Sequence, residues 1–76
     1  MTVKEVIKVD PEILGGTPVF AGTRVPIKTL FDHLEFSSLE EFLAGFPTVK
    51  RVQAEVVIEW AGNLVQIISR QYESAA

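Results

Sequence analysis

The sequence contains no cysteine and only one histidine, His33, among its 76 residues. Without cysteine the chain can form no disulfide and no thiolate nucleophile, and a single histidine cannot complete a structural zinc site. A chain of this length buries only about 60% of the surface that its unfolded form exposes, and such small domains are often stabilised by oligomerisation. We therefore expect a homodimer that uses no metal and no cofactor.

The chain is also short of basic residues and of long apolar runs. The chain has seven Lys and Arg residues and ten Asp and Glu residues, which gives a formal net charge of −3 and a pI near 5.0. Nucleic-acid binders are usually basic, so any DNA contact must come from a local patch. Residues 1–10 lack the apolar core of a signal peptide, and no stretch reaches the roughly 18 apolar residues of a membrane span. We expect one cytoplasmic domain that does not contact a membrane.

Catalytic groupings are equally scarce. One histidine supports no Ser-His-Asp arrangement, and the scattered carboxylates Asp10, Glu12 and Asp32 are typical of a solvated surface. We interpret His33 as a partly exposed bystander on a helix, and we place Trp60 on a core stripe. The sequence therefore predicts neither enzymatic activity nor a small-molecule substrate.

Residues 15–26, GGTPVFAGTRVP, gather glycines and prolines around two short apolar pairs. Five residues separate Gly16 from Gly22, whereas a phosphate-binding Walker loop has four between its glycines and then a lysine. The stretch instead predicts a β-hairpin, in which residues 19–20 and 24–25 pair across a tight turn that needs the positive φ of Gly22.

The fold class that we expect is mainly α with a small N-terminal β-hairpin. Residues 3–9 alternate as a strand does, so residues 1–26 form a strand-and-hairpin arm. Three helices follow within residues 27–72, and residues 73–76 form a frayed tail. The apolar positions of the three helices are, in turn, Ile27, Leu30, Phe31 and Leu34; Leu39, Phe42 and Leu43; and Val49, Val52, Val56, Trp60, Leu64, Ile67 and Ile68.

Polar and small residues indicate where these helices begin and end. Ser37 and Ser38 are alternative N-caps of the second helix, because each has a glutamate three residues later. Gly45 is placed to cap the C-terminus of that helix, and Thr48 to cap the start of the third. Gly62 leaves open whether the third helix is continuous.

The second and third helices have the proportions of a helix-turn-helix, whose second helix contacts DNA with its first turn. The side chains of that turn that we expect to contact DNA are Thr48, Lys50, Arg51 and Gln53. The alternative is an ordinary pair of capped helices whose two adjacent cations lie on a solvated surface. A homodimer would use the surplus apolar residues of the third helix, namely Val57, Ile58, Ala61 and Val65.

Several motifs together resemble the bacterial and archaeal family DUF433. The residues that carry the resemblance are Asp10, Pro11, Gly15, Gly16, Pro18, Gly22, Thr23, Arg24 and Pro26, with the acidic helix at residues 38–43 and the Phe46-Pro47 pair. The resemblance runs from about residue 7 to residue 61. It implies a hairpin followed by a homeodomain-like three-helix unit, and an antitoxin of VapB type encoded beside a toxin with a PIN-like ribonuclease domain.

On this resemblance the chain is expected to be a non-catalytic antitoxin that binds a PIN-like toxin and its own operator DNA. The surface that we expect to contact the toxin lies on the C-terminal half of the last helix, about residues 63–72, and includes Ile67, Ile68, Arg70 and Tyr72. Two alternatives stay open, a stand-alone DNA-binding regulator and a structural interaction module. Arg24 either pairs with Asp10 or makes a functional contact.

Overall fold

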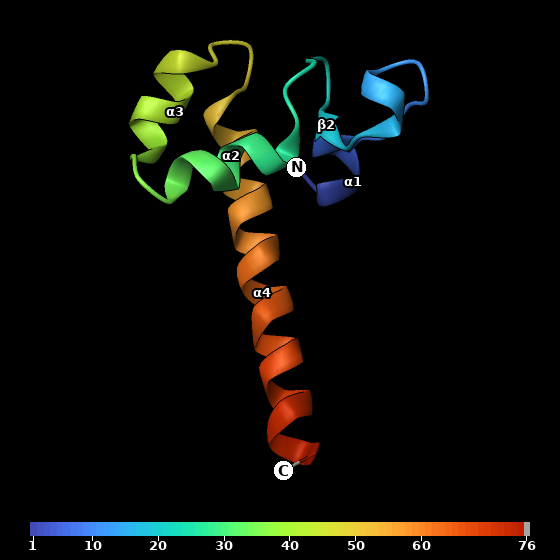
Figure 1. Cartoon of the computed structure of the whole chain (residues 1–76), viewed down its shortest axis with the longest axis vertical. Helices are drawn as coiled ribbons and strands as arrows, with labels where there is room; N and C mark the ends of the chain where they lie inside the picture. Colours follow the sequence, from blue (N-terminus) through green and yellow to red (C-terminus); the bar gives the residue numbers. More distant parts are fainter. Residues whose placement is uncertain (76) are drawn as a thin grey trace.

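The computed structural model of the chain describes the backbone of residues 1–75 and the side chains of residues 1–71. This part of the chain is mostly helical and carries a small two-stranded antiparallel sheet near its N-terminus. Figure 1 shows two regions, a head that contains the N-terminus and a helix, α4 (Arg51–Ala75), that projects from it. We call residues 1–59 the head and residues 60–75, the projecting part of α4, the stalk.

The N-terminal residues form a helix where the sequence had predicted a strand. Helix α1 is Val3–Val6, and only Ile7–Lys8 form a strand, β1. The backbone N–H of Thr2 donates a hydrogen bond of 3.1 Å to the carboxylate of Glu5, which is half of a capping box and favours a helical turn. Val6 is fully buried, so this short helix contributes to the core.

Strand β2 (Val19–Phe20) lies at the centre of the arm. It pairs antiparallel with β1, where Ile7 lies opposite Phe20, and a single bridge joins its other edge to Pro26. The predicted turn is present, since Gly22 has a φ of 78° and the Phe20 N–H donates to the Val25 carbonyl at 3.0 Å. The second strand of the hairpin is reduced to that one bridge, because Pro26 has no N–H to extend a ladder.

Helices α2 (Ile27–Leu34) and α3 (Leu39–Gly45) follow where the apolar period predicted them. The Ser38 hydroxyl accepts a hydrogen bond of 3.1 Å from the Glu41 N–H, which makes Ser38 the N-cap. Ser37 instead donates to the His33 carbonyl at 2.7 Å. The prediction that Gly45 caps α3 was wrong: Gly45 is the last helical residue and has no positive φ.

The core of the head brings together residues from α1, β2, α2, α3, α4 and the loop before α4. Its buried apolar members are Val6, Phe20, Leu30, Phe42, Val49, Ala54 and Val57. Phe42 is central, with its ring 5.0 Å from that of Phe46 and 6.3 Å from that of Phe20. His33 is partly buried in this aromatic group, 5.2 Å from the Phe46 ring, and so contributes packing.

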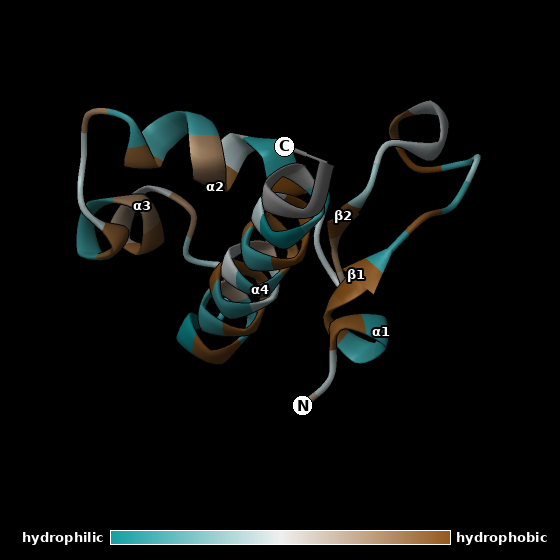
Figure 2. Cartoon of the chain, turned by 90° about the horizontal axis from the view of Figure 1, so that it is seen from below, coloured by the Kyte–Doolittle hydropathy of each residue, from teal (hydrophilic) through white to brown (hydrophobic). Residues whose placement is uncertain are grey.

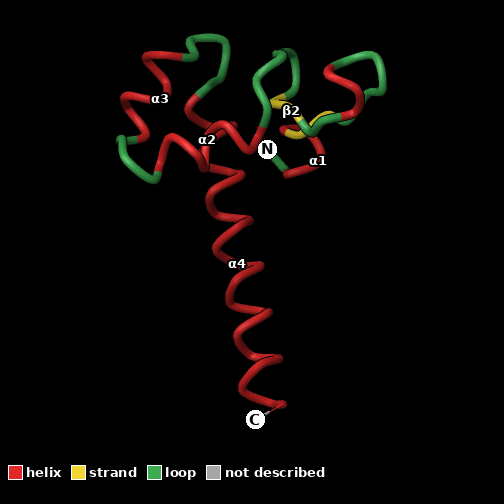
Figure 3. Tube along the Cα trace, viewed as in Figure 1, coloured by secondary structure: helices red, strands yellow, loops and turns green. Residues whose placement is uncertain are grey.

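Helix α4 begins at Arg51, so the expected cap at Thr48 lies too early. The Lys50 N–H donates instead to the side-chain oxygen of Gln53 at 3.0 Å. The helix is continuous through Gly62 and extends to Ala75, so it includes residues 73–75, which were expected to lie in a tail beyond it, and Ala76 lies outside the described residues (Figure 3). None of the described helices has both the length and the hydropathy that crossing a membrane requires.

Candidate functional site

The side of α4 that packs on the head continues along the stalk. Ala54 and Val57 on this side are fully buried. On a helix that advances about 100° per residue, Leu64 and Ile68 lie on the same side as Val57. The side chains of Leu64 and Ile68 are 42% and 44% exposed, because the head does not extend far enough along α4 to cover them. Figure 2 looks along α4, between α2 and α3 on one side and the strands on the other. The core-facing side of α4 is thus uncovered beyond the head within the described chain.

This exposed surface is wide and carries no charge. Residues 61–69 include no acidic or basic side chain. A helix advances about 100° per residue, so the apolar residues of this segment and Trp60 together cover an arc of about 160° around the helix axis. The large apolar side chains exposed on the stalk are Trp60, Leu64, Val65, Ile67 and Ile68. We call these five residues the stalk face; Asn63, Gln66 and Arg70 lie on the opposite, polar side of the helix.

Two of the predicted positions on α4 require correction. Val57 was expected on the dimer surface, but it is completely buried in the head and cannot contact a second chain. Trp60 was expected in the core, but it is 46% exposed, because it lies where α4 leaves the head. The apolar stripe therefore divides at this point into a covered part and an exposed part.

The other predicted partner-binding residues are distributed along the same helix. Ile58 packs partly against the core, and Ala61 is half-buried at the junction. Val65, Ile67 and Ile68 are exposed on the stalk face, and Arg70 is exposed on the polar side. The side chain of Tyr72 lies outside the described residues. Val65, Ile67 and Ile68 are thus the predicted partner-binding positions that form one continuous surface.

A groove marks the point where the stalk face leaves the head. It has a volume of about 470 Å³, and Trp60 lines one side of it. Ile7, Val9, Pro18 and Ile27 from the arm and from α2 line the other side. Because Val9 is 62% exposed, apolar surface extends from the stalk onto the head. The stalk face and this groove, which share Trp60, together form one exposed apolar surface.

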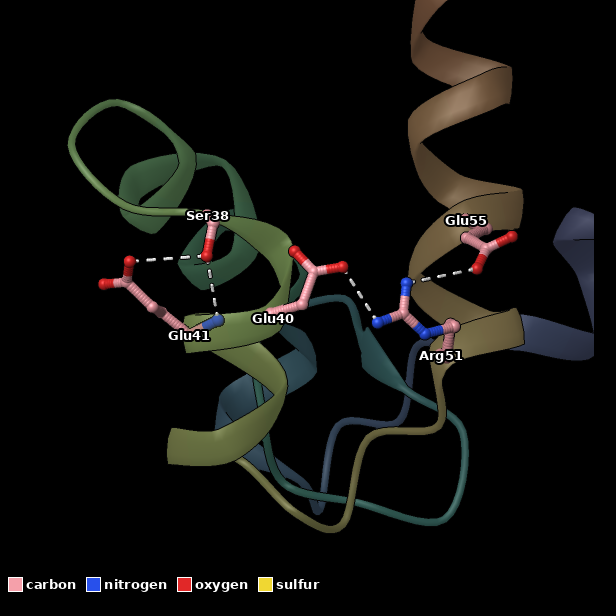
Figure 4. Close-up of polar contacts among 5 residues, drawn as sticks. All are labelled: Ser38, Glu40, Glu41, Arg51 and Glu55. Carbon is pink, nitrogen blue, oxygen red and sulfur yellow. Dashed lines mark hydrogen bonds and ion pairs between the residues drawn. The ribbon is translucent and has the colours of Figure 1, made fainter.

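In the turn predicted to contact DNA, Arg51 and Gln53 make polar contacts within the protein itself. The guanidinium of Arg51 lies 3.0 Å from the Glu40 carboxylate and 3.6 Å from that of Glu55 (Figure 4). The pKa of Glu40 lies below its usual value because its own backbone N–H, and then Arg51, donate hydrogen bonds to it. The hydrogen bond to Glu40 likewise raises the pKa of Arg51. Two carboxylates therefore balance the charge of this arginine.

Gln53 is not available to read a base in this structure. It is only 7% exposed, and its side-chain nitrogen donates a hydrogen bond of 3.1 Å to the Ala21 carbonyl. Its side-chain oxygen accepts from the Lys50 N–H, so both ends of the amide are used inside the fold. Thr48 and the side chain of Lys50 are exposed, and neither side chain is paired with a carboxylate among the described residues.

The expected pair between Arg24 and Asp10 does not form among the described residues. The Asp10 carboxylate accepts a hydrogen bond of 2.9 Å from the Glu12 N–H, which stabilises the turn after β1. Arg24 is exposed in the turn after β2. Within the described residues, no group of three or more histidine and carboxylate side chains is arranged to hold a metal ion.

The fold and the exposed stalk define a small, mostly helical protein with a short antiparallel sheet and an uncovered helical face. Residues 7–61 match the family described as "Protein of unknown function (DUF433)", and the chain belongs to this family. It is similar to the crystal structure of a DUF433 member from Anabaena variabilis ATCC 29413, with a TM-score of 0.66 and 21% identity over 91% of this chain and 69% of that chain. This likeness shows the fold. The search of curated proteins found no match.

Proposed function

We propose that this chain is a non-catalytic interaction protein of antitoxin type, which binds a PIN-like ribonuclease through the stalk face. The observation that carries the proposal is the continuity between the buried side of α4 and the exposed residues Leu64, Ile67 and Ile68. Large apolar side chains grouped on one exposed helical face mark an interaction surface. Their spacing suits the insertion of a helix into an apolar groove of a partner.

The stalk face is wide enough to contact two partner chains at once. A single helix contact uses a stripe of roughly 100°, which is narrower than the arc exposed here. We propose that Ala61 and Val65, on one edge, contact a second copy of this chain, and that Leu64 and Ile67, on the other edge, contact the ribonuclease. The pairing with a second copy is supported by residues 61–69, which bring no like charges together.

DNA binding through a homeodomain-like arrangement is the less supported function. α3 and α4 follow one another as the two helices of a helix-turn-helix do. However, Arg51 is paired with two carboxylates and Gln53 is buried, which leaves few groups in the first turn to contact a duplex. We therefore assign no DNA-reading role to that turn.

A ribonuclease-protection assay tests the proposal. The proposed partner, a PIN-like ribonuclease encoded beside this chain, is incubated with RNA and increasing amounts of the chain. The Leu64→Gln/Ile67→Gln double variant should need at least ten times more protein for the same protection, because two apolar anchors are lost. The control is Asn63→Ser/Gln66→Ser on the polar side, which should protect as the natural chain does. Equal protection by the first variant would exclude the stalk face as the inhibitory surface.

A further inference from the structure

A second pocket lies on the head, away from the stalk face. It has a volume of about 600 Å³, and Lys8, Arg24 and Thr48 contribute the polar side chains that could bind a ligand there. These residues come from β1, from the turn after β2 and from the loop before α4. Figure 1 shows that turn and that loop at the end of the head opposite the stalk. Three segments that are distant in sequence thus meet around one space.

The two cations of this pocket have no partner among the described residues, although the chain carries ten acidic residues against seven basic ones. Two of the other cations are paired with carboxylates. Lys28 pairs with Asp32 at 2.9 Å, and Arg51 pairs with Glu40 at 3.0 Å. The positive charge of Lys8 and Arg24 is therefore available to a ligand from outside the chain.

The turn that carries Arg24 is held by its own hydrogen bonds. The Thr23 hydroxyl donates to the Phe20 carbonyl at 2.8 Å and accepts from the Val25 N–H at 3.0 Å. The backbone on each side of Arg24 is thus fixed before any ligand binds, which lowers the entropy cost of binding. Ile13 and Val25 add apolar lining next to the cations, and apolar surroundings strengthen an ionic contact.

We propose that this pocket binds a phosphate group. Lys8 and Arg24 would supply two positive charges, which match the nearly dianionic phosphate better than the single charge of a carboxylate. The hydroxyl of Thr48 would add a third donor for a third oxygen. The group belongs either to free phosphate or a phosphate monoester, which carries close to two negative charges, or to a nucleic-acid backbone, whose phosphodiester carries one. The proposal is independent of the stalk face and does not rest on the function proposed above.

Titration with inorganic phosphate, followed by amide NMR against chloride at equal ionic strength, tests the site. We expect saturable shifts at residues 8, 22–25 and 48. Arg24→Gln should weaken the apparent affinity at least tenfold, and Arg24→Lys should do so less, because it keeps the charge and loses the planar fork. Lys28→Gln, which removes a cation elsewhere on the head, should leave the titration unchanged. Lys8→Gln provides the second test if Arg24→Gln does not keep a folded spectrum.

A DNA duplex, added at the same salt concentration, distinguishes the two sources of phosphate. Duplex binding that Arg24→Gln weakens in parallel assigns the site to a nucleic-acid backbone. Phosphate binding without duplex binding assigns it to free phosphate or a small phosphate ester. The proposal is overturned if phosphate produces no saturable shifts at these residues, or if Lys28→Gln weakens the titration as much as Arg24→Gln does.

Discussion

The side chain of Gln53 donates a hydrogen bond of 3.1 Å to the backbone carbonyl of Ala21, which lies 32 residues earlier. This contact joins the first turn of α4 to the turn that follows β2. The same amide accepts from the Lys50 N–H at 3.0 Å, so it also closes the start of the helix. One nearly buried polar side chain thus connects the start of α4 to the turn after β2.

Replacing Gln53 with Leu should destabilise the head by about 1–3 kcal/mol, because the Ala21 carbonyl and the Lys50 N–H would both lose a partner. Urea denaturation followed by circular dichroism measures the change. Gln66→Leu on the polar side of the stalk is the matched control and should stay within about 0.5 kcal/mol. Equal midpoints for the two variants would show that the Gln53 contacts contribute nothing.

Two single glycine-to-alanine substitutions should change the stability of the chain in opposite directions. Gly22 has a φ of 78°, and a Cβ there is strained by about 1–2 kcal/mol in the left-handed region, so Gly22→Ala should lower the melting temperature. Gly62 is helical and has open space around it, so Gly62→Ala should stabilise α4 by up to about 1 kcal/mol. Thermal denaturation of both variants measures the signs. A destabilised Gly62→Ala chain would contradict a continuous α4.

The ion pair between Glu40 and Arg51 should weaken in acid. The folded-state pKa of Glu40 is lowered, first by its own backbone N–H and then by Arg51. A lowered pKa means that the unfolded chain binds the proton more readily, so the contribution is present above about pH 4.3 and is lost as the pH falls through the folded value. The difference in urea midpoint between the natural chain and Glu40→Gln should therefore shrink from pH 7 to about pH 3.

Glu59→Gln is the control for this titration, because Glu59 forms no ion pair within the described residues. Its difference from the natural chain should change less over the same range. A Glu40→Gln difference that is constant with pH would mean that the carboxylate charge does not stabilise the contact between α3 and α4.

The chain should associate with itself through the edge of the stalk that carries Val65. Val65 is 61% exposed, and Val65→Lys would place like charges together at a symmetric contact. We expect light scattering to give a dimer mass that falls on micromolar dilution, and Val65→Lys to give a monomer mass. Gln66→Lys, which adds the same charge on the polar side, should remain dimeric. A monomer mass of the natural chain at every concentration would contradict the dimer.

The sequence predicted the elements that rest on a clear period or on turn chemistry. The apolar spacing from Ile27 to Leu34 and the serines before Leu39 placed α2 and α3 correctly. The strand predicted at residues 3–9 was wrong over its first half, because alternation over so few residues also fits one helical turn. The sequence did contain a signal for that turn, a threonine at position 2 with a glutamate at position 5.

The candidate site was harder to predict, because it depends on how far the head covers α4. Periodicity shows that Val57, Trp60 and Leu64 share a side of the helix, but it does not show where the covering residues end. For the same reason Val57 was assigned to a partner and Trp60 to the core. Gln53 could not be recognised as buried, since its hydrogen-bond acceptor comes from a distant turn.

The central claim is that the stalk face binds the ribonuclease, and shortening the chain tests it most directly. A chain ending at Gly62 keeps every residue of the buried core and loses Leu64, Val65, Ile67 and Ile68. Its fold is checked by circular dichroism, and its affinity for the proposed partner, a PIN-like ribonuclease encoded beside this chain, is measured by calorimetry next to that of the full chain. We predict that the folded, shortened chain binds at least a hundred times more weakly. Equal affinity for the two chains would contradict the account.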